Sequence, residues 1–163
     1  MSVSVHVTPR GTRGGRMPTG GPMGWLFKQF NRYTIRRYKR AGSEGISSRM
    51  GFPVVLLTTK GAKSGLERTT PIGGFPDGEN VWLVVASLAG AARHPAWFLN
   101  LAAHPDDVWL EVGKERFKVS CESVEGEERR LAMARVAAIA PRYGKYQEHT
   151  DREIPIVRLT RQG

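Results

Sequence analysis

The sequence predicts a mainly β protein with flanking helices, built around an antiparallel sheet or barrel. Three observations support this fold class. Short apolar and β-branched segments recur from residue 52 onward, turn sequences with Gly, Pro and Asp separate several of them, and segments of helical periodicity lie before, between and after them. The length of 163 residues suits one domain that buries its own core without disulfides.

The first 50 residues carry most of the positive charge. They hold ten Lys and Arg residues against one acidic residue, Glu44, in a chain whose formal net charge is +10. Residues 1–22 are rich in Gly, Pro, Thr and Arg, with almost no apolar side chains after Val7. Such a segment cannot offset its ordering entropy, so we expect a disordered basic arm before a domain at residues 23–163.

A basic amphipathic helix is predicted for residues 23–40. Its apolar side chains recur at intervals of three and four: Met23, Leu26, Phe27, Phe30 and Tyr33. Its cations form a second stripe: Lys28, Arg32, Arg36 and Lys39. Gly42 and Gly45 are expected to end the helix.

The remaining chain alternates between strand and helix patterns. Strands are predicted near residues 54–59, 68–75, 81–87, 108–112, 115–124 and 154–159. The turn sequences at 76–79 and 113–114 predict hairpins. Helices are predicted at 95–103, where Pro95 suits the first turn, and at 127–140, which begins with acidic residues and stops at Pro141.

The segment from Thr58 to Arg68 is predicted to be a turn that binds an anion such as phosphate. Gly61 and Gly65 permit positive φ and close backbone approach, while Lys63 and Arg68 supply positive charge. The glycine spacing and the strand that follows exclude a nucleotide P-loop. The alternative interpretation is a basic hairpin tip that only keeps a sheet edge soluble.

The composition also limits compartment and metal chemistry. Cys121 is the only cysteine, which excludes an intrachain disulfide and a cysteine-based zinc cluster and fits a reducing cytoplasm. No apolar run reaches the ~20 residues that span a bilayer, and no secretory signal pattern is present. His94 and His104 lack the spacing of a helical metal pair, so no metal site is expected. We therefore expect a cytoplasmic protein.

Four blocks of residues, in order along the chain, carry a family resemblance. The first runs from Leu57 to Pro71 and reads Leu-Thr-Thr-x-Gly-x-Lys-Ser-Gly-x-x-Arg-x-x-Pro. The second comprises Val85, Ala86, Ser87 and Gly90, the third runs from His94 to Leu101 around Trp97, and the fourth joins Tyr143 and Tyr146 to residues 150–157. Over about residues 25–160 the chain resembles the deazaflavin-dependent nitroreductase family of actinobacteria, split-barrel oxidoreductases that use coenzyme F420.

The resemblance implies an antiparallel split β-barrel that binds F420. It places Lys63, Ser64 and Arg68 on the acidic tail of the cofactor, whose phosphodiester and carboxylates suit paired cations. The ring would be lined by strand and helix residues: Thr70, Pro71, Ile72, Val85, Ala86, Ser87, Ala96, Trp97 and Asn100. Thr69, Leu88 and Tyr143 complete the expected cofactor-binding residues.

The implied activity is hydride transfer from reduced F420 to an electron-poor acceptor such as a quinone, an enone or a nitroaromatic. A hydroxyl near the ring would deliver the accompanying proton, and the candidates are Ser87, Tyr143 and Tyr146. The resemblance does not indicate which acceptor this protein reduces, because the chain departs from the family at positions expected near the acceptor. Gly73 stands in place of an aromatic residue, Leu88 in place of a polar or basic one, and Ala140 in place of a tyrosine.

Other functions remain open at this point. A split barrel that binds FMN would use a similar basic turn. Residues 1–40 would suit an anionic membrane or nucleic acid, and their aromatic content favours the membrane. In a plainer interpretation, Met23, Leu26, Phe27 and Phe30 pack the helix against the barrel. A homodimer is compatible with a split barrel.

Plainer interpretations also exist for single residues. Trp97 would fit an ordinary core position, because large aromatic side chains are usually buried. Asn100 would fit a role in capping a backbone group. Arg68 would fit a surface ion pair with Glu67 or Asp77, a contact of ~0 to 1 kcal/mol.

Overall fold

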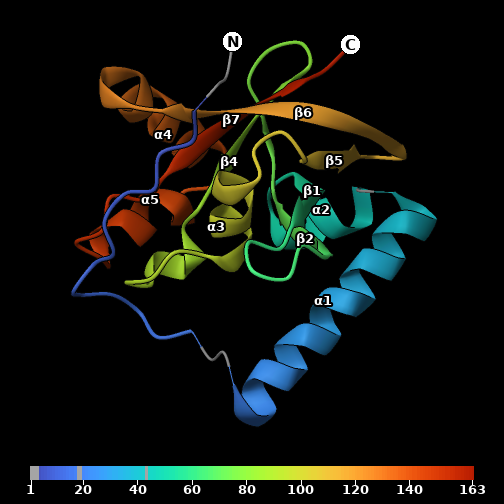
Figure 1. Ribbon diagram of the computed structural model, residues 1–163, viewed down its shortest axis with the longest axis horizontal. Helices are drawn as coiled ribbons and strands as arrows, with labels where there is room; N and C mark the ends of the chain where they lie inside the picture. Colours follow the sequence, from blue (N-terminus) through green and yellow to red (C-terminus); the bar gives the residue numbers. More distant parts are fainter. Residues whose placement is uncertain (1–3, 18–19, 43) are drawn as a thin grey trace.

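The computed structural model describes residues 4–17, 20–42 and 44–163. Within this part of the chain, seven antiparallel strands form one sheet in the order β2-β1-β5-β6-β7-β4-β3 (Figure 1). The strands are β1 (Val54–Lys60), β2 (Glu67–Gly73), β3 (Phe75–Pro76), β4 (Val81–Val85), β5 (Trp109–Val112), β6 (Glu115–Val124) and β7 (Ile156–Arg161). The helices are α1 (Gly21–Ala41), α2 (Glu44–Met50), α3 (Ala96–Ala103), α4 (Gly126–Ile139), α5 (Arg142–Glu148) and the short 3-10 helix η1 (Leu88–Gly90).

The sheet curls at its longest strand, β6, which pairs with a different strand along each part of its length. The first part of β6 pairs with β5, and its later part pairs with β7. This arrangement is the half-barrel of the split-barrel fold, so the predicted fold class is confirmed. Both predicted hairpins are also confirmed, since β3 pairs with β4 and β5 pairs with β6.

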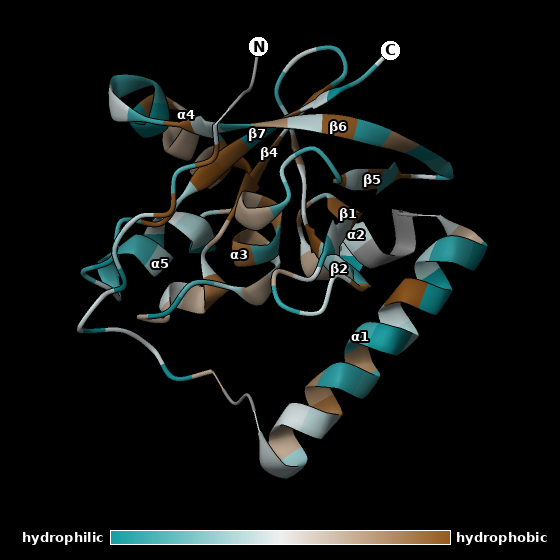
Figure 2. Cartoon of the chain, viewed as in Figure 1, coloured by the Kyte–Doolittle hydropathy of each residue, from teal (hydrophilic) through white to brown (hydrophobic). Residues whose placement is uncertain are grey.

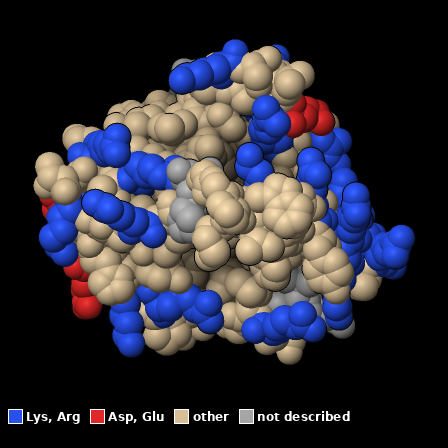
Figure 3. Space-filling view, turned by 90° about the horizontal axis from the view of Figure 1, so that it is seen from below, with Lys and Arg blue, Asp and Glu red and all other residues tan. Residues whose placement is uncertain are grey.

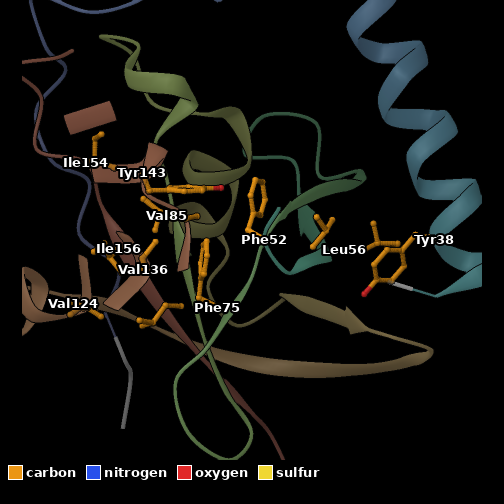
Figure 4. Packing of buried hydrophobic residues seen from close by; sticks show 14 residues of the cluster. Tyr38, Phe52, Leu56, Phe75, Val85, Val124, Val136, Tyr143, Ile154 and Ile156 are labelled. Atoms are coloured by element: carbon orange, nitrogen blue, oxygen red, sulfur yellow. The ribbon is translucent and has the colours of Figure 1, made fainter. Parts of the chain in front are cut away.

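Strand β1 is buried on both faces and therefore joins two hydrophobic clusters. Val54 and Leu56 point to one cluster, whereas Val55 and Leu57 point to the other. The first cluster lies on the side of α4 and α5 (Figure 4). The second contains Trp97 and other residues of α3, so this helix packs over the opposite face of the strand. Cys121 is buried there, and burial raises the pKa of its thiol to about 12, as expected for a packed thiol without reactivity.

Three short helices were not predicted: α2, η1 and α5. Pro141 ends α4 as expected, but α5 begins directly after it. The reason is that a proline suits the position before a helix as well as the position after one. The helix α5 is functionally relevant because it carries Tyr143 and Tyr146.

The described part of the N-terminal segment, residues 4–17, makes hydrogen bonds to the body of the protein. Gly11 donates a backbone hydrogen bond to Ala92 O (2.9 Å) and Gly15 donates one to Gly90 O (3.0 Å). The backbone N–H groups of Thr12 and Arg13 donate to the carboxylate of Asp151. This arm therefore runs along the body of the protein as an extended strap, held by polar partners that composition does not reveal (Figure 1).

Helix α1 is attached mainly at its C-terminal end. Tyr38 is 1% exposed; its hydroxyl donates to Glu111 O (3.1 Å) and accepts from Gly113 N (2.9 Å). The apolar residues nearer the N-terminal end are exposed by 46–61%: Met23, Trp25, Leu26, Phe27, Phe30 and Tyr33. The interpretation in which Met23, Leu26, Phe27 and Phe30 pack the helix onto the barrel is therefore wrong, because the helix runs diagonally away from the sheet (Figure 2). None of the described helices combines the length and hydropathy needed to cross a bilayer.

Candidate functional site

A cavity of about 550 Å³ lies between α1, the end of β2, the turn after β4 and the start of α3. Its lining is mostly apolar and includes Phe27, Phe52, Ile72, Val85 and Trp97. A cavity of this size, with apolar walls and a few polar groups, is typical of sites that bind small molecules.

The structure brings nine of the predicted cofactor-binding residues together around this cavity. They are Thr70, Pro71, Ile72, Val85, Ser87, Leu88, Ala96, Trp97 and Tyr143. They come from four separate places in the chain, which the sheet and α3 position side by side. Trp97 is 8% exposed, so it belongs to the core cluster and also forms part of the cavity wall.

Four predicted residues do not line the cavity but lie behind its wall. Ala86 follows the end of β4 and is fully buried in the second hydrophobic cluster, and the hydroxyl of Thr69 lies 2.9 Å from that of Thr58. Asn100 Oδ1 accepts a hydrogen bond from the backbone N–H of Ala62 (3.0 Å), so it fixes the basic turn. Tyr146 packs against Tyr143, with ring centroids 5.4 Å apart.

The basic turn between β1 and β2 presents Lys63, Ser64 and Arg68 to solvent, outside the cavity. Gly65 has φ 70°, whereas Gly61 is required for a different reason: a Cβ there would collide with the hydroxyl of Ser64. Neither Lys63 nor Arg68 has an ion-pair partner among the described residues.

The proposed surface pairing of Arg68 is not formed. Asp77 instead pairs with Arg135, with 3.0 Å between Nε and Oδ1. Both cations of the turn therefore stay available for an anion. Strand β2 leads directly from Arg68 to Thr70 on the cavity wall.

The turn after β4 is an unusual backbone segment held by one buried arginine. Leu88 and Ala89 have φ 43° and 52°, a left-handed conformation that is costly for residues other than glycine. Arg152, 1% exposed, donates to the carbonyls of Ala86 (3.1 Å), Ser87 (3.0 Å) and Ala91 (3.1 Å). In a trans peptide the N–H points opposite to the C=O. The N–H group that follows each of these three carbonyls therefore points away from Arg152.

His94 supports this arginine. Its Nδ1 lies 3.0 Å from Arg152 Nη1 and its Nε2 lies 2.6 Å from Thr8 O. Since a guanidinium only donates, Nδ1 accepts and Nε2 carries the proton. Burial lowers the pKa of His94 and keeps it neutral. The described residues contain no cluster of three His, Cys, Asp or Glu side chains that could hold a metal ion.

Tyr143 places a phenol at the cavity. Its ring contacts Phe52 and Phe75 edge-on, with centroids 5.6 and 5.2 Å away (Figure 4). Burial raises the pKa of Tyr143 to about 12, so the phenol stays protonated at neutral pH. The hydroxyl has no hydrogen-bond partner among the described residues and is available to a ligand.

Several cavity residues were not predicted from the sequence. Four are cations, Lys28, Arg37, Arg49 and Arg93, and others are the aromatic residues Phe27, Phe30, Tyr33 and Phe52. The helical periodicity placed Lys28, Phe27, Phe30 and Tyr33 on one helix, but it does not show that this helix forms a wall of a cavity. That wall depends on the angle at which α1 leaves the sheet, which Tyr38 fixes.

Comparison with known proteins identifies relatives of this chain. The F420H(2)-dependent quinone reductase Rv1261c of Mycobacterium tuberculosis (strain ATCC 25618 / H37Rv) is 42% identical over 112 residues, which cover 67% of this chain and 74% of the relative. A solved F420-H2 dependent reductase (FDR-A) superimposes with a TM-score of 0.59 at 34% identity, covering 65% of this chain and 92% of that one. A second structure, described as a domain-swapped dimer, has a TM-score of 0.61 at 31% identity and covers 85% and 99%.

The family comparison agrees with these relatives. A family model described as F420H(2)-dependent quinone reductase matches residues 30–161, which include the basic turn, the β4 turn and α5. These proteins are oxidoreductases whose hydride donor is reduced F420. The chain belongs to the F420H(2)-dependent quinone reductase family.

Proposed function

We propose that this protein reduces a quinone with a hydride from reduced F420, and that the cavity beside β2 holds the reacting groups. The observation that carries the proposal is the combination of apolar walls with a single buried phenol, Tyr143, that has no partner among the described residues. The walls suit a flat heterocycle, and the phenol suits a carbonyl oxygen of the acceptor.

The residues present fit F420. Thr70, Pro71, Ile72, Val85 and Trp97 offer a largely apolar wall for the ring. The phosphate and carboxylates of the tail would be held by Ser64 and by Lys63 and Arg68, which have no ion-pair partner among the described residues. When bound, reduced F420 supplies the hydride.

We assign indirect roles to the predicted residues that lie behind the wall. Asn100 supports the basic turn through Ala62, and Ala86 supports the β4 turn through its carbonyl bond to Arg152. Thr69 braces β2 against β1 through Thr58. Their substitution would alter cofactor affinity through the shape of the site.

Tyr143 is the proposed proton donor. A quinone that accepts a hydride, and so two electrons, needs one further proton to become a quinol. Tyr143 Oη would donate this proton and recover it from water. Tyr146 orients the Tyr143 ring, and Ser87 is a further hydroxyl-bearing residue that lines the cavity.

The activity is tested with purified protein, reduced F420 and a panel of a short-chain quinone, an enone and a nitroaromatic. We expect the quinone to be reduced fastest, and Tyr143→Phe to lower kcat by about 10²- to 10⁴-fold while F420 still binds. Failure to oxidise reduced F420 with any quinone would overturn the proposal. So would an affinity for FMN equal to or greater than that for F420.

We further propose that α1 brings the protein to an anionic membrane surface, where a lipophilic quinone would be available. The exposed apolar residues of α1 continue from the cavity, since Phe27, Phe30 and Tyr33 are exposed and also line it. The neighbouring cations Lys28 and Arg32 are exposed, and neither pairs with an acidic residue of the described chain. Figure 3 looks toward this end of the molecule and shows an uncharged area bordered by Lys and Arg, with few acidic residues. This arrangement suits the plane of a membrane interface.

Co-sedimentation with vesicles containing an anionic phospholipid tests this proposal. Leu26→Ser with Phe30→Ser should reduce binding, because it removes the apolar residues that would enter the interface. The matched control is Leu131→Ser with Ile139→Ser, which removes two apolar residues of α4 with exposed fractions of 45% and 47%. Equal loss in both variants, or stronger binding to DNA than to vesicles, would contradict the proposal.

A homodimer is a further proposal for the same helix, supported by the relative that forms a domain-swapped dimer. Because α1 projects from the sheet, it is the element that could exchange between two copies. Light scattering on the wild-type protein and on the Leu26→Ser, Phe30→Ser variant decides this. A dimer that dissociates in the variant would support the exchange, and a monomer in both would exclude it.

A further inference from the structure

Gly73 occupies a place in the cavity wall where the structure has no room for a side chain. It is the last residue of β2, it is buried, and it pairs with Val54 of β1. Its φ is not in the left-handed region, so the backbone does not require a glycine here. The restriction comes from the neighbouring side chains.

The nearest of these neighbours is the hydroxyl of Tyr143. A Cβ at position 73 would lie 2.7 Å from Tyr143 Oη, 3.1 Å from Phe75 Cε2 and 3.2 Å from Phe52 Cδ2. The first distance is shorter than any real contact of this kind, so either the phenol or the strand would have to move. The rings of Phe52 and Phe75 lie beside Tyr143 (Figure 4), and the ring of Tyr146 also contacts it, so its movement is restricted.

We propose that Gly73 is a positioning residue of the acceptor subsite, because it leaves Tyr143 Oη the position from which this phenol meets the acceptor. The acceptor class is a planar carbonyl compound, whose oxygen would receive the hydrogen bond that Tyr143 offers to no described residue. This inference rests on the proposed function, in which Tyr143 is the proton donor. A side chain at position 73 would both displace the phenol of Tyr143 and reduce the volume of the acceptor subsite.

The contact itself is tested first, without cofactor or acceptor, by a double-mutant cycle on thermal stability. Gly73→Ala should lower the Tm in the wild-type background and lower it less in the Tyr143→Phe background, where the colliding oxygen is gone. Gly144→Ala is the matched control, because its Cβ would lie 3.5 Å from Ala137 Cβ, an ordinary contact. Equal Tm losses in the two backgrounds would overturn the inference.

The effect on the reaction with the acceptor is tested with reduced F420 and the short-chain quinone. Gly73→Ala should lower kcat/KM for the quinone by about tenfold or more, because misplacing a reacting group by a fraction of an ångström is costly. The Kd for F420 should change by less than about threefold, and Gly144→Ala should leave both values unchanged. An unchanged kcat/KM in Gly73→Ala, or an equal loss in the Tyr143→Phe background, would overturn the inference.

The two proposals fail in different ways. If the wild-type protein reduces no quinone, the proposed function fails, whereas the stability cycle still reports whether Gly73 and Tyr143 exclude each other. If the wild-type protein is active and Gly73→Ala is equally active, only the role of Gly73 fails.

Discussion

The guanidinium of Arg152 and the imidazole of His94 form a buried hydrogen bond, 3.0 Å between Nη1 and Nδ1. No carboxylate takes part in this contact; the other partners of Arg152 are three backbone carbonyls. Because Thr8 O accepts from His94 Nε2, the pair also connects the N-terminal arm to the β4 turn at the cavity. The positions of Ser87 and Leu88 therefore depend on residues that do not reach the cavity.

Arg152→Met should destabilise the fold by about 3 kcal/mol or more, because the buried carbonyls of Ala86 and Ala91 lose the donor that Arg152 supplies, at ~1–3 kcal/mol each. The carbonyl of Ser87 loses one of its two donors and keeps Gly90 N–H. Arg152→Lys should recover only part of this, since an ammonium cannot reach all three carbonyls. Urea unfolding measures both effects. Arg130→Met, on an exposed ion pair, is the control and should change little. Similar stability of Arg152→Met and the control would show that Arg152 does not hold the turn.

Stability should fall on the acid side of neutrality because of His94. Its pKa in the folded protein is lowered from 6.5, chiefly by burial, so the unfolded chain binds the proton more readily. The stability that neutral His94 contributes is fully present above pH 6.5, the pKa in the unfolded chain. It is lost as the pH falls toward the pKa of His94 in the folded protein. His94→Gln keeps an acceptor for Arg152 and a donor for Thr8 O but cannot titrate. Unfolding free energies measured between pH 7.5 and about 5 should therefore fall less steeply in this variant than in the wild type; parallel curves would argue against the role of His94.

The sequence predicted elements whose pattern is local and missed contacts between distant segments. Strand β1 was found because it is apolar and β-branched, and β2 was found because it is rich in strand-forming residues and followed by a turn sequence. The basic turn was found because its glycines and cations are adjacent in the chain. In contrast, a single arginine at position 152 gives no sign that it is buried, and Gly73 gives no sign that Tyr143 Oη lies beside it.

For the N-terminal residues too, the sequence predicted the local structure but not the contacts. The spacing of apolar residues predicted correctly that α1 is helical and amphipathic. It did not predict that the apolar residues of α1 remain exposed, because that depends on the anchor at Tyr38 and on the direction of the helix. Similarly, the residues of the arm have little apolar surface to bury, and composition does not predict their backbone hydrogen bonds to Ala92 and Asp151.

The basic turn should control affinity for F420. Lys63→Ala with Arg68→Ala should raise the Kd about 100-fold, if each cation contributes ~1.5 kcal/mol through a charge-assisted hydrogen bond. Quenching of F420 fluorescence measures the affinity. Arg10→Ala with Lys114→Ala is the control, since both side chains are exposed and the change in net charge is the same. An equal loss of affinity in both double variants would mean that the turn contributes only general charge.

Asp151 should determine whether the arm stays attached. Hydrogen bonds from Thr12 and Arg13 lower the pKa of Asp151 to about 2, with the Thr12 hydroxyl as the main cause. The attachment is therefore complete above the ordinary carboxyl pKa of 3.8 and weakens as the pH falls toward 2. At neutral pH, Asp151→Ala should release the arm and speed tryptic cleavage after Arg10, Arg13 and Arg16, which mass spectrometry can follow. Glu79→Ala removes an exposed acid with no partner among the described residues, so trypsin should cleave this variant as fast as the wild type. Equal cleavage of all three proteins would show that Asp151 does not hold the arm, and that hydrogen bonds such as those of Thr8, Gly11 and Gly15 are sufficient.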